Sequence, residues 1–188
     1  MNYTHPFPLT TYDSLRSYTR DYMEKYNKND IYAVGVKVSK EIKTNLEEEL
    51  TSYGLPGVLN FLAFKRKNYI TPRLETVHID VDYSDNFIHA SIVLPIDGCA
   101  GTTMFWMEGQ YERTTHLLPH GDSYQLLNWK NTPTIIAERE IVEPTLCCVN
   151  VPHDALSNAN GSYRTVLTIR LKGNPTFNEI IKKRYSQT

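Results

Sequence analysis

Residues 76–82 read TVHIDVD and alternate polar and apolar side chains without interruption. Strict alternation with a period of two predicts a β-strand that is buried on one face. Its apolar residues would pack on that face, while His78 and Asp80 project side by side from the other. An imidazole and a carboxylate on one stiff strand are half of a metal site, although a lone His-x-Asp pair is also common on surface strands.

The chain around this stretch has the pattern of an all-β protein from residue 58 onward. Pro, Gly, Asn and Asp separate short runs that are rich in Val, Ile, Thr, Tyr and Phe. About eight such runs in one block predict a jelly roll or a barrel. The expected strands lie near 58–65, 74–82, 87–95, 102–108, 123–129, 134–141, 145–151 and 163–171.

Helical patterns flank this block on both sides. Residues 12–26 and the residues that follow Ser39 carry apolar side chains at helical spacing, and Gly54 is placed to end the second helix. A short strand is expected at 31–38 between these helices, and a last helix near 176–184. The sequence therefore predicts helices before a β core and one helix after it.

The length of 188 residues corresponds to about one domain. We expect a single domain over 1–188, with a helical N-terminal support at 1–57, a jelly-roll core at 58–172 and a C-terminal helix and tail at 173–188. A chain of this size can bury a core without disulfides or a structural metal.

Charge and composition argue against several classes of partner. The 20 Lys and Arg against 21 Asp and Glu give a net charge of −1 with mixed signs, so there is no nucleic-acid or acidic-membrane signal. The N-terminal residues lack the features of a signal peptide, and no apolar run approaches the roughly 18 residues of a membrane helix. Three cysteines are an odd number, and adjacent Cys147 and Cys148 would point to opposite faces of one strand. We expect an unexported, cytoplasmic protein with reduced thiols.

A second histidine and an arginine complete the constellation. His153 follows a mostly apolar strand, and two His with one carboxylate form the ligand set that selects Fe(II) while leaving positions open. Arg164 lies in the strand 163–171, whose odd positions are mostly apolar, so its side chain belongs to the opposite face. A guanidinium directed into a barrel needs an anionic partner and matches a carboxylate in shape. A dicarboxylate ligand would satisfy Arg164.

Together these residues resemble the Fe(II)/2-oxoglutarate-dependent dioxygenases, a family built on a double-stranded β-helix, or jelly roll. The family pattern is His-x-Asp on an early core strand, a distal His near the penultimate strand and an Arg on the last strand. Here it is matched by His78, Asp80, His153 and Arg164. The resemblance extends over about residues 74–171.

Two turns add to the resemblance. Residues 101–106 (GTTMFW) look like the Gly-rich turn that leads into a strand of the family core, and Glu143-Pro144 looks like the turn before the strand that leads to the distal His. The first seventy or so residues match only as helices, which in such cores usually brace the larger sheet.

The resemblance implies an oxygenase. His78, Asp80 and His153 would be the catalytic metal ligands that hold Fe(II), and Arg164 would bind the far carboxylate of the co-substrate 2-oxoglutarate. With O2, such an enzyme hydroxylates a substrate and releases succinate and CO2. No substrate signature is present in the sequence, and the oligomeric state is not indicated.

One position departs from the family pattern. Many members carry Ser or Thr two residues after the arginine, where it also touches 2-oxoglutarate, whereas this chain has Val166. Another residue would have to supply this contact. The candidates are Thr168, Ser91 and Tyr69.

For one further arginine and three histidines, the sequence favours a structural or surface role over a role in the site. Arg170 lies about 20 Å from Arg164 along an extended strand, so we expect a surface or salt-bridge residue that does not grip the same small ligand. A polar loop is expected at 112–122. Solvent or rim positions are expected for His89, His116 and His120.

Two other functions remain open. A cupin-like metalloenzyme would use the same metal cage without 2-oxoglutarate, although cupins usually show His-x-His with a later Glu. A non-catalytic jelly-roll protein would serve as a binding or scaffold module. Arg164 is the residue that favours 2-oxoglutarate, and metal analysis would separate the scaffold from both enzymes.

Overall fold

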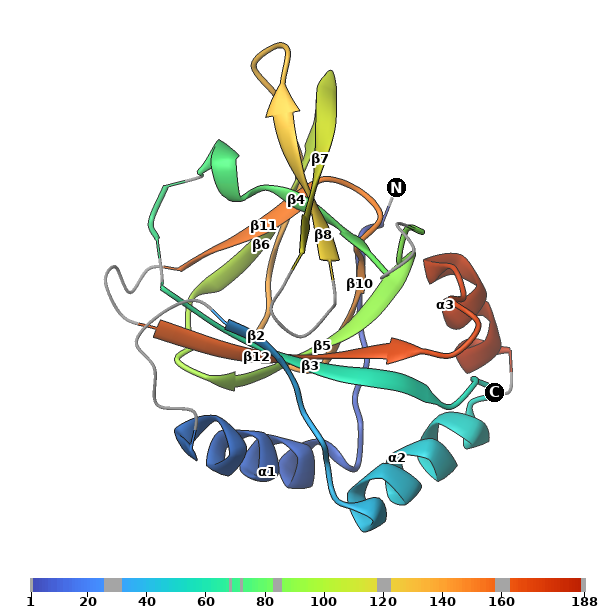
Figure 1. Cartoon of the computed structure of the whole chain (residues 1–188). Helices are drawn as coiled ribbons and strands as arrows, with labels where there is room; N and C mark the ends of the chain where they lie inside the picture. The colour runs from blue at the N-terminus through green and yellow to red at the C-terminus, as the bar shows by residue number, and fades with distance from the viewer. Residues whose placement is uncertain are drawn as a thin grey trace.

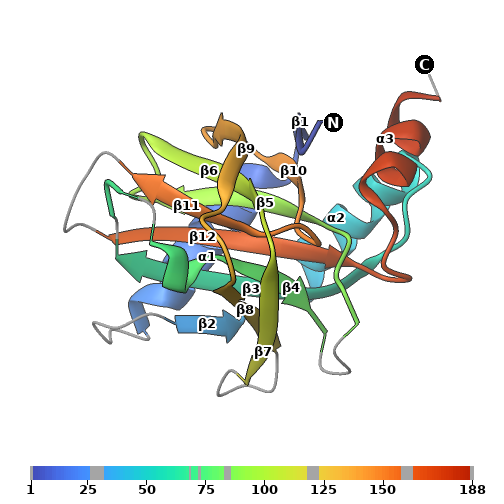
Figure 2. The same cartoon turned by 90° about the horizontal axis from the view of Figure 1, so that it is seen from above.

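The computed structural model describes residues 2–25, 32–67, 69–71, 73–82, 86–117, 123–157 and 163–186. These residues form two six-stranded antiparallel sheets with three helices packed outside them (Figures 1 and 2). The helices are α1 (Tyr12–Lys25), α2 (Lys40–Ser52) and α3 (Phe177–Tyr185), and η1 (Leu74–Thr76) is a single 3-10 turn. The strands are β1 (Thr4–Pro6), β2 (Tyr32–Gly35), β3 (Val58–Lys67), β4 (His78–Val81), β5 (Ala90–Asp97), β6 (Thr102–Glu108), β7 (Tyr111–Leu117), β8 (Ser123–Trp129), β9 (Thr134–Glu140), β10 (Thr145–Cys148), β11 (His153–Ser157) and β12 (Tyr163–Leu171).

The order of strands in the sheets is that of a jelly roll. The first sheet runs β1-β10-β5-β12-β3-β2, and the second runs β7-β8-β4-β11-β6-β9. Most neighbours are distant in sequence, because successive parts of the chain cross between the two sheets. The prediction of a mainly β, double-stranded β-helix is therefore confirmed.

The last strand, β12, shows how the core is divided. Leu167, Ile169 and Leu171 pack in the same apolar cluster as Leu15 of α1 and Leu46 of α2. In Figure 1, α1 and α2 lie along the outer face of the first sheet. The predicted bracing of one sheet by the N-terminal helices is confirmed. The alternate residues of β12, beginning with Arg164, face the second sheet.

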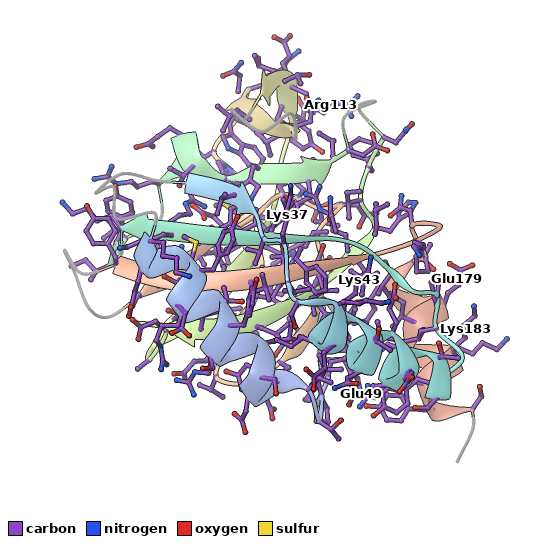
Figure 3. All side chains as sticks on the ribbon, turned by 60° about the horizontal axis from the view of Figure 1, so that its bottom comes forward. Lys37, Lys43, Glu49, Arg113, Glu179 and Lys183 are labelled. Atoms are coloured by element: carbon purple, nitrogen blue, oxygen red, sulfur yellow. The ribbon has the colours of Figure 1, made fainter. Side chains whose placement is uncertain are left out.

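The two N-terminal helices are also tied together by a carboxylate. Glu49 of α2, labelled in Figure 3, accepts the backbone N–H groups of Thr10 at 2.6 Å and Thr11 at 3.2 Å, just before α1 begins. An anion at this end of a helix satisfies donors that the helix cannot satisfy itself. Ser39 caps α2 as predicted, because its side chain accepts the N–H of Ile42. No helix in the described residues combines the length and the apolar character needed to cross a bilayer.

The strand expected at 74–82 is only partly present. Leu74–Thr76 form the 3-10 turn η1, and β4 begins at His78. The N–H of Thr76 donates to the carbonyl of Arg73 at 3.0 Å. Because this backbone donor bonds within the turn, it is not available to a neighbouring strand. Several other predicted strands are present with ends shifted by a few residues.

The prediction of a loop at 112–122 was wrong for residues 112–117, which form a strand. Tyr111–Leu117 form β7, which pairs with β8, and these two strands extend to the top of Figure 1. Residues 112–115 are exposed on both faces, so this strand has no apolar alternation to reveal it. One of them, Arg113, labelled in Figure 3, lies over the ring of Phe87. The short strands β1 and β11 were also not predicted.

Candidate metal centre

The three predicted ligands meet in the middle of the second sheet. β4 carries His78 and Asp80 on one face, and His153 is the first residue of β11, directly across the ladder from His78. The two imidazole rings lie 4.6 Å apart between centroids, and Nε2 of His78 lies 3.7 Å from Oδ1 of Asp80. One ligand atom from each residue lies within 4.8 Å of the others. His153, which the sequence placed after a strand, is therefore itself the first residue of a further strand.

Backbone carbonyls fix the orientation of both imidazoles. Nδ1 of His78 lies 2.9 Å from the carbonyl of Thr76, and Nδ1 of His153 lies 2.8 Å from the carbonyl of Val151. A carbonyl oxygen can only accept, so each Nδ1 carries the proton. In the neutral ring, Nε2 then has the lone pair that a metal ligand needs.

His78 is held in this neutral form by its surroundings. Burial is the main cause that lowers its pKa to about 4; the neighbouring His153 also lowers it, and Asp80 opposes the change. At neutral pH, Nε2 of His78 therefore carries no proton that a cation would have to displace.

Asp80 is ionised and paired inside the protein. Its side chain lies between His78 on the Oδ1 side and Arg170, whose Nη2 is 3.4 Å from Oδ2. Burial opposes the charged carboxylate, but Arg170 and the two histidines outweigh it and lower the pKa of Asp80. Arg170 is only 3% exposed. Of the two positions expected for Arg170, the surface or a salt bridge, the structure shows a buried salt bridge.

A pocket joins the triad to the predicted co-substrate arginine. His78, Asp80 and His153 line this pocket together with Arg164. Arg164 is 4% exposed, and its Nη2 donates to the carbonyl of Ala155 at 3.0 Å. Burial lowers the pKa of Arg164, and the charge of another arginine lowers it further. Arg164 therefore faces the pocket between the sheets, as the alternation of residues 163–171 predicted.

That other arginine, Arg66, and its partner Asp154 were not predicted. Arg66 of β3 lies directly opposite Arg164 in the β3–β12 ladder, and both line the pocket. Nη1 of Arg66 lies 2.9 Å from Oδ1 of Asp154, and Oδ2 of Asp154 accepts the hydroxyl of Thr76. Burial raises the pKa of Asp154, but Arg66 and other neighbours lower it overall. A buried carboxylate thus balances one of two adjacent guanidinium groups.

The three candidates for the missing hydroxyl contact occupy different places. Thr168 lines the pocket, and its hydroxyl donates to the carbonyl of Leu62 at 3.2 Å. Ser91 is buried but does not line the pocket. Tyr69 does not line it either, and the guanidinium of Arg73 lies over its ring at 3.7 Å.

Among the described residues, the other histidines and the cysteines form no second cluster. Within the described part of the chain, the triad is the one group of three His, Cys, Asp or Glu with ligand-like spacing. Nδ1 of His89 lies 3.2 Å from the amide of Asn150. Cys147 and Cys148 belong to different apolar clusters, and burial raises the pKa of both thiols. His116 lies in β7, and His120 lies outside the described residues.

Comparisons with known proteins find distant structural similarity. No protein-family model and no curated protein matches this sequence. The non-heme alpha-ketoglutarate-dependent carbocyclase SnoK from nogalamycin biosynthesis is similar with a TM-score of 0.46 and 10% identity, covering 88% of this chain and 77% of SnoK. The ycfD protein of E. coli is similar with a TM-score of 0.34 and 13% identity, covering 76% of this chain and 33% of ycfD. At these values the function has to be argued from the residues of the site.

Proposed function

We propose that this protein is an Fe(II)- and 2-oxoglutarate-dependent oxygenase, which oxidises a substrate and releases succinate and CO2. One observation carries the proposal. A triad of two imidazoles and one carboxylate shares a single pocket with Arg164, a buried arginine that a dicarboxylate would suit.

The donor set of the triad fits Fe(II). Nε2 of His78, Nε2 of His153 and Oδ1 of Asp80 are two imidazole nitrogens and one carboxylate oxygen, and three protein ligands leave coordination positions for other molecules. Bound there, Fe(II) would supply the oxygen chemistry that no protein side chain can perform. Arg170 holds Oδ2 of Asp80, so Oδ1 remains the oxygen on the side of the histidines.

The rest of the pocket would bind and orient the co-substrate. The fork of Arg164 would hold the carboxylate far from the metal, so that the 2-oxo acid end reaches the triad. Apolar side chains, including Val93, Met104 and Val166, line the same pocket as the triad and Arg164 and would exclude water from it. Exclusion of water would strengthen the ionic contacts of both carboxylates of 2-oxoglutarate.

Metal analysis and a product assay test the proposal. Protein purified without chelator and loaded with Fe(II) under anaerobic conditions should hold stoichiometric iron. Once O2 is admitted, with ascorbate as the reductant in place of the unknown substrate, it should convert 2-oxoglutarate to succinate. The variant His153→Ala should lose both properties, whereas His5→Ala should keep them, because His5 lies in β1 of the other sheet.

The contrary results point to the other functions. A protein that binds no first-row metal would be a jelly-roll scaffold. A protein that binds the metal but neither binds nor consumes 2-oxoglutarate would be a cupin-like metalloenzyme. Either result would overturn the proposal.

A further inference from the structure

Thr102, the first residue of β6, has a buried hydroxyl that the fold does not use. Its side chain lines the pocket, and the residue is 2% exposed. Its N–H donates to Cys99 and its carbonyl accepts from Ile141, both at 2.9 Å, so the backbone is satisfied. Its Oγ1 has no hydrogen-bond partner among the described residues. Valine has the same shape without the cost of an unsatisfied hydroxyl, so stability alone does not explain a threonine here.

Strand register places Thr102 at the arginine end of the pocket. Along the β6–β11 ladder, Trp106 pairs with His153, Met104 with Ala155 and Thr102 with Ser157. The guanidinium of Arg164 bonds to the carbonyl of Ala155. Along β11 the order is thus His153, then Ala155 with its contact to Arg164, then Ser157 opposite Thr102. Thr102 therefore lies beyond the Arg164 contact, at the end of the pocket away from His153.

The charges at this end favour one more anion. Arg164 and Arg66 lie opposite each other on adjacent strands, and like charges in that arrangement repel. Asp154 neutralises Arg66, which leaves one positive charge among the three side chains. A single carboxylate placed between the strands would balance that charge.

We propose that Thr102 Oγ1 donates a hydrogen bond to the distal carboxylate of 2-oxoglutarate, beside the guanidinium of Arg164. This inference rests on the proposed function and adds a co-substrate-binding residue to it. Thr102 takes the place of the hydroxyl that Val166 cannot provide, from the facing sheet instead of from β12. The hydroxyl of Thr168 is the weaker candidate because it already donates to Leu62.

Two ligands and three variants test this assignment. Calorimetry would measure binding of 2-oxoglutarate and of 2-oxopentanoate, which lacks the distal carboxylate, to the Mn(II)-loaded protein. In Thr102→Val the dissociation constant for 2-oxoglutarate should rise at least about tenfold, because a hydrogen bond to a charged group is lost. Binding of 2-oxopentanoate should not change. Thr102→Ser should retain most of the affinity.

Ser91→Ala is the matched control. The hydroxyl of Ser91 is also buried and has no partner in the described residues, but Ser91 does not line the pocket. This variant should bind both ligands as the wild type does. Without ligand, Thr102→Val should unfold at or above the wild-type temperature.

Each other result overturns the assignment in a recognisable way. If wild type binds 2-oxoglutarate and Thr102→Val binds it equally well, the assignment of Thr102 falls and the proposed function stands. Equal weakening of both ligands, or failure of Thr102→Val to fold, would show that the hydroxyl serves the structure. If wild type does not bind 2-oxoglutarate, the proposed function falls together with this inference.

Discussion

Arg170 of β12 and Asp80 of β4 form an ion pair between the two sheets, with 3.4 Å between Nη2 and Oδ2. Both residues are less than 9% exposed. The pair connects the last core strand to the carboxylate of the triad. It also means that Arg170 cannot serve as an inert comparison for Arg164.

Removing the arginine of this pair should destabilise the protein. Arg170→Met leaves the Asp80 carboxylate buried without its cation, which should lower the free energy of unfolding by about 3 kcal/mol. Urea unfolding with a chelator present would measure this loss. Addition of a divalent metal should recover part of it, because the cation then compensates Asp80. The exposed Arg139 of β9 supplies the control Arg139→Met, which should change stability by less than about 0.5 kcal/mol.

A double variant separates metal binding from stability. Asp80→Asn should abolish tight metal binding and also destabilise the fold, because Arg170 loses its partner. The double variant Asp80→Asn, Arg170→Met should lose less free energy of unfolding than the two single variants lose together, because no buried charge is left unpaired. It should still bind no metal. Metal binding by the double variant at wild-type affinity would rule out Asp80 as a ligand.

His78 makes the stability of the metal-free protein depend on pH. Its pKa is about 4 in the folded protein and 6.5 ordinarily, so between these values only the unfolded chain binds the proton. Acid therefore favours unfolding. This contribution is complete above pH 6.5 and is lost as the pH falls toward 4, by about 3 kcal/mol in total.

Urea unfolding between pH 4 and pH 7.5 would check this dependence. His78→Gln should show a clearly smaller loss of stability over the same range, because glutamine does not titrate. Parallel curves for wild type and His78→Gln would mean that another group causes the dependence.

Arg164, the proposed co-substrate arginine, should tolerate no conservative replacement. Arg164→Lys substitutes a point charge for a planar fork, and loss of a bidentate contact should cost about 2 kcal/mol, or a roughly thirtyfold rise in the dissociation constant of 2-oxoglutarate. Metal affinity should stay nearly unchanged. Calorimetry would measure the affinities of Arg164→Lys and of the exposed control Arg139→Lys for 2-oxoglutarate and for the metal. Equal affinities in the two variants would place the distal carboxylate elsewhere.

Much of the site could be predicted because it follows local alternation. The period of two in β4 put His78 and Asp80 on one face, and the same rule in β12 turned Arg164 inward. For Arg170, expected at the surface or in a salt bridge, the structure shows the salt bridge, with Asp80 as the partner that the sequence did not identify. A long side chain on the same inward face can reach across to the facing sheet, which a separation along one strand does not reveal.

The other pocket residues are positioned by strand pairings that no local sequence pattern encodes. Arg66 meets Arg164 only through the register of β3 with β12, and Thr102 reaches the pocket through the register of β6 with β11. Strand β7 was missed for a different reason. Its described side chains are largely exposed, so burial leaves no trace in its sequence.

The central claim is that the triad and Arg164 form one site for a metal and a 2-oxo acid. Anaerobic titration of the metal-free protein with Fe(II) and then 2-oxoglutarate tests it most directly, by watching for a metal-to-ligand charge-transfer band. The band should appear and saturate in the wild type, should be absent in Asp80→Asn and should require more 2-oxoglutarate in Arg164→Lys. A wild-type protein that binds Fe(II) but shows no band at saturating 2-oxoglutarate would contradict the claim.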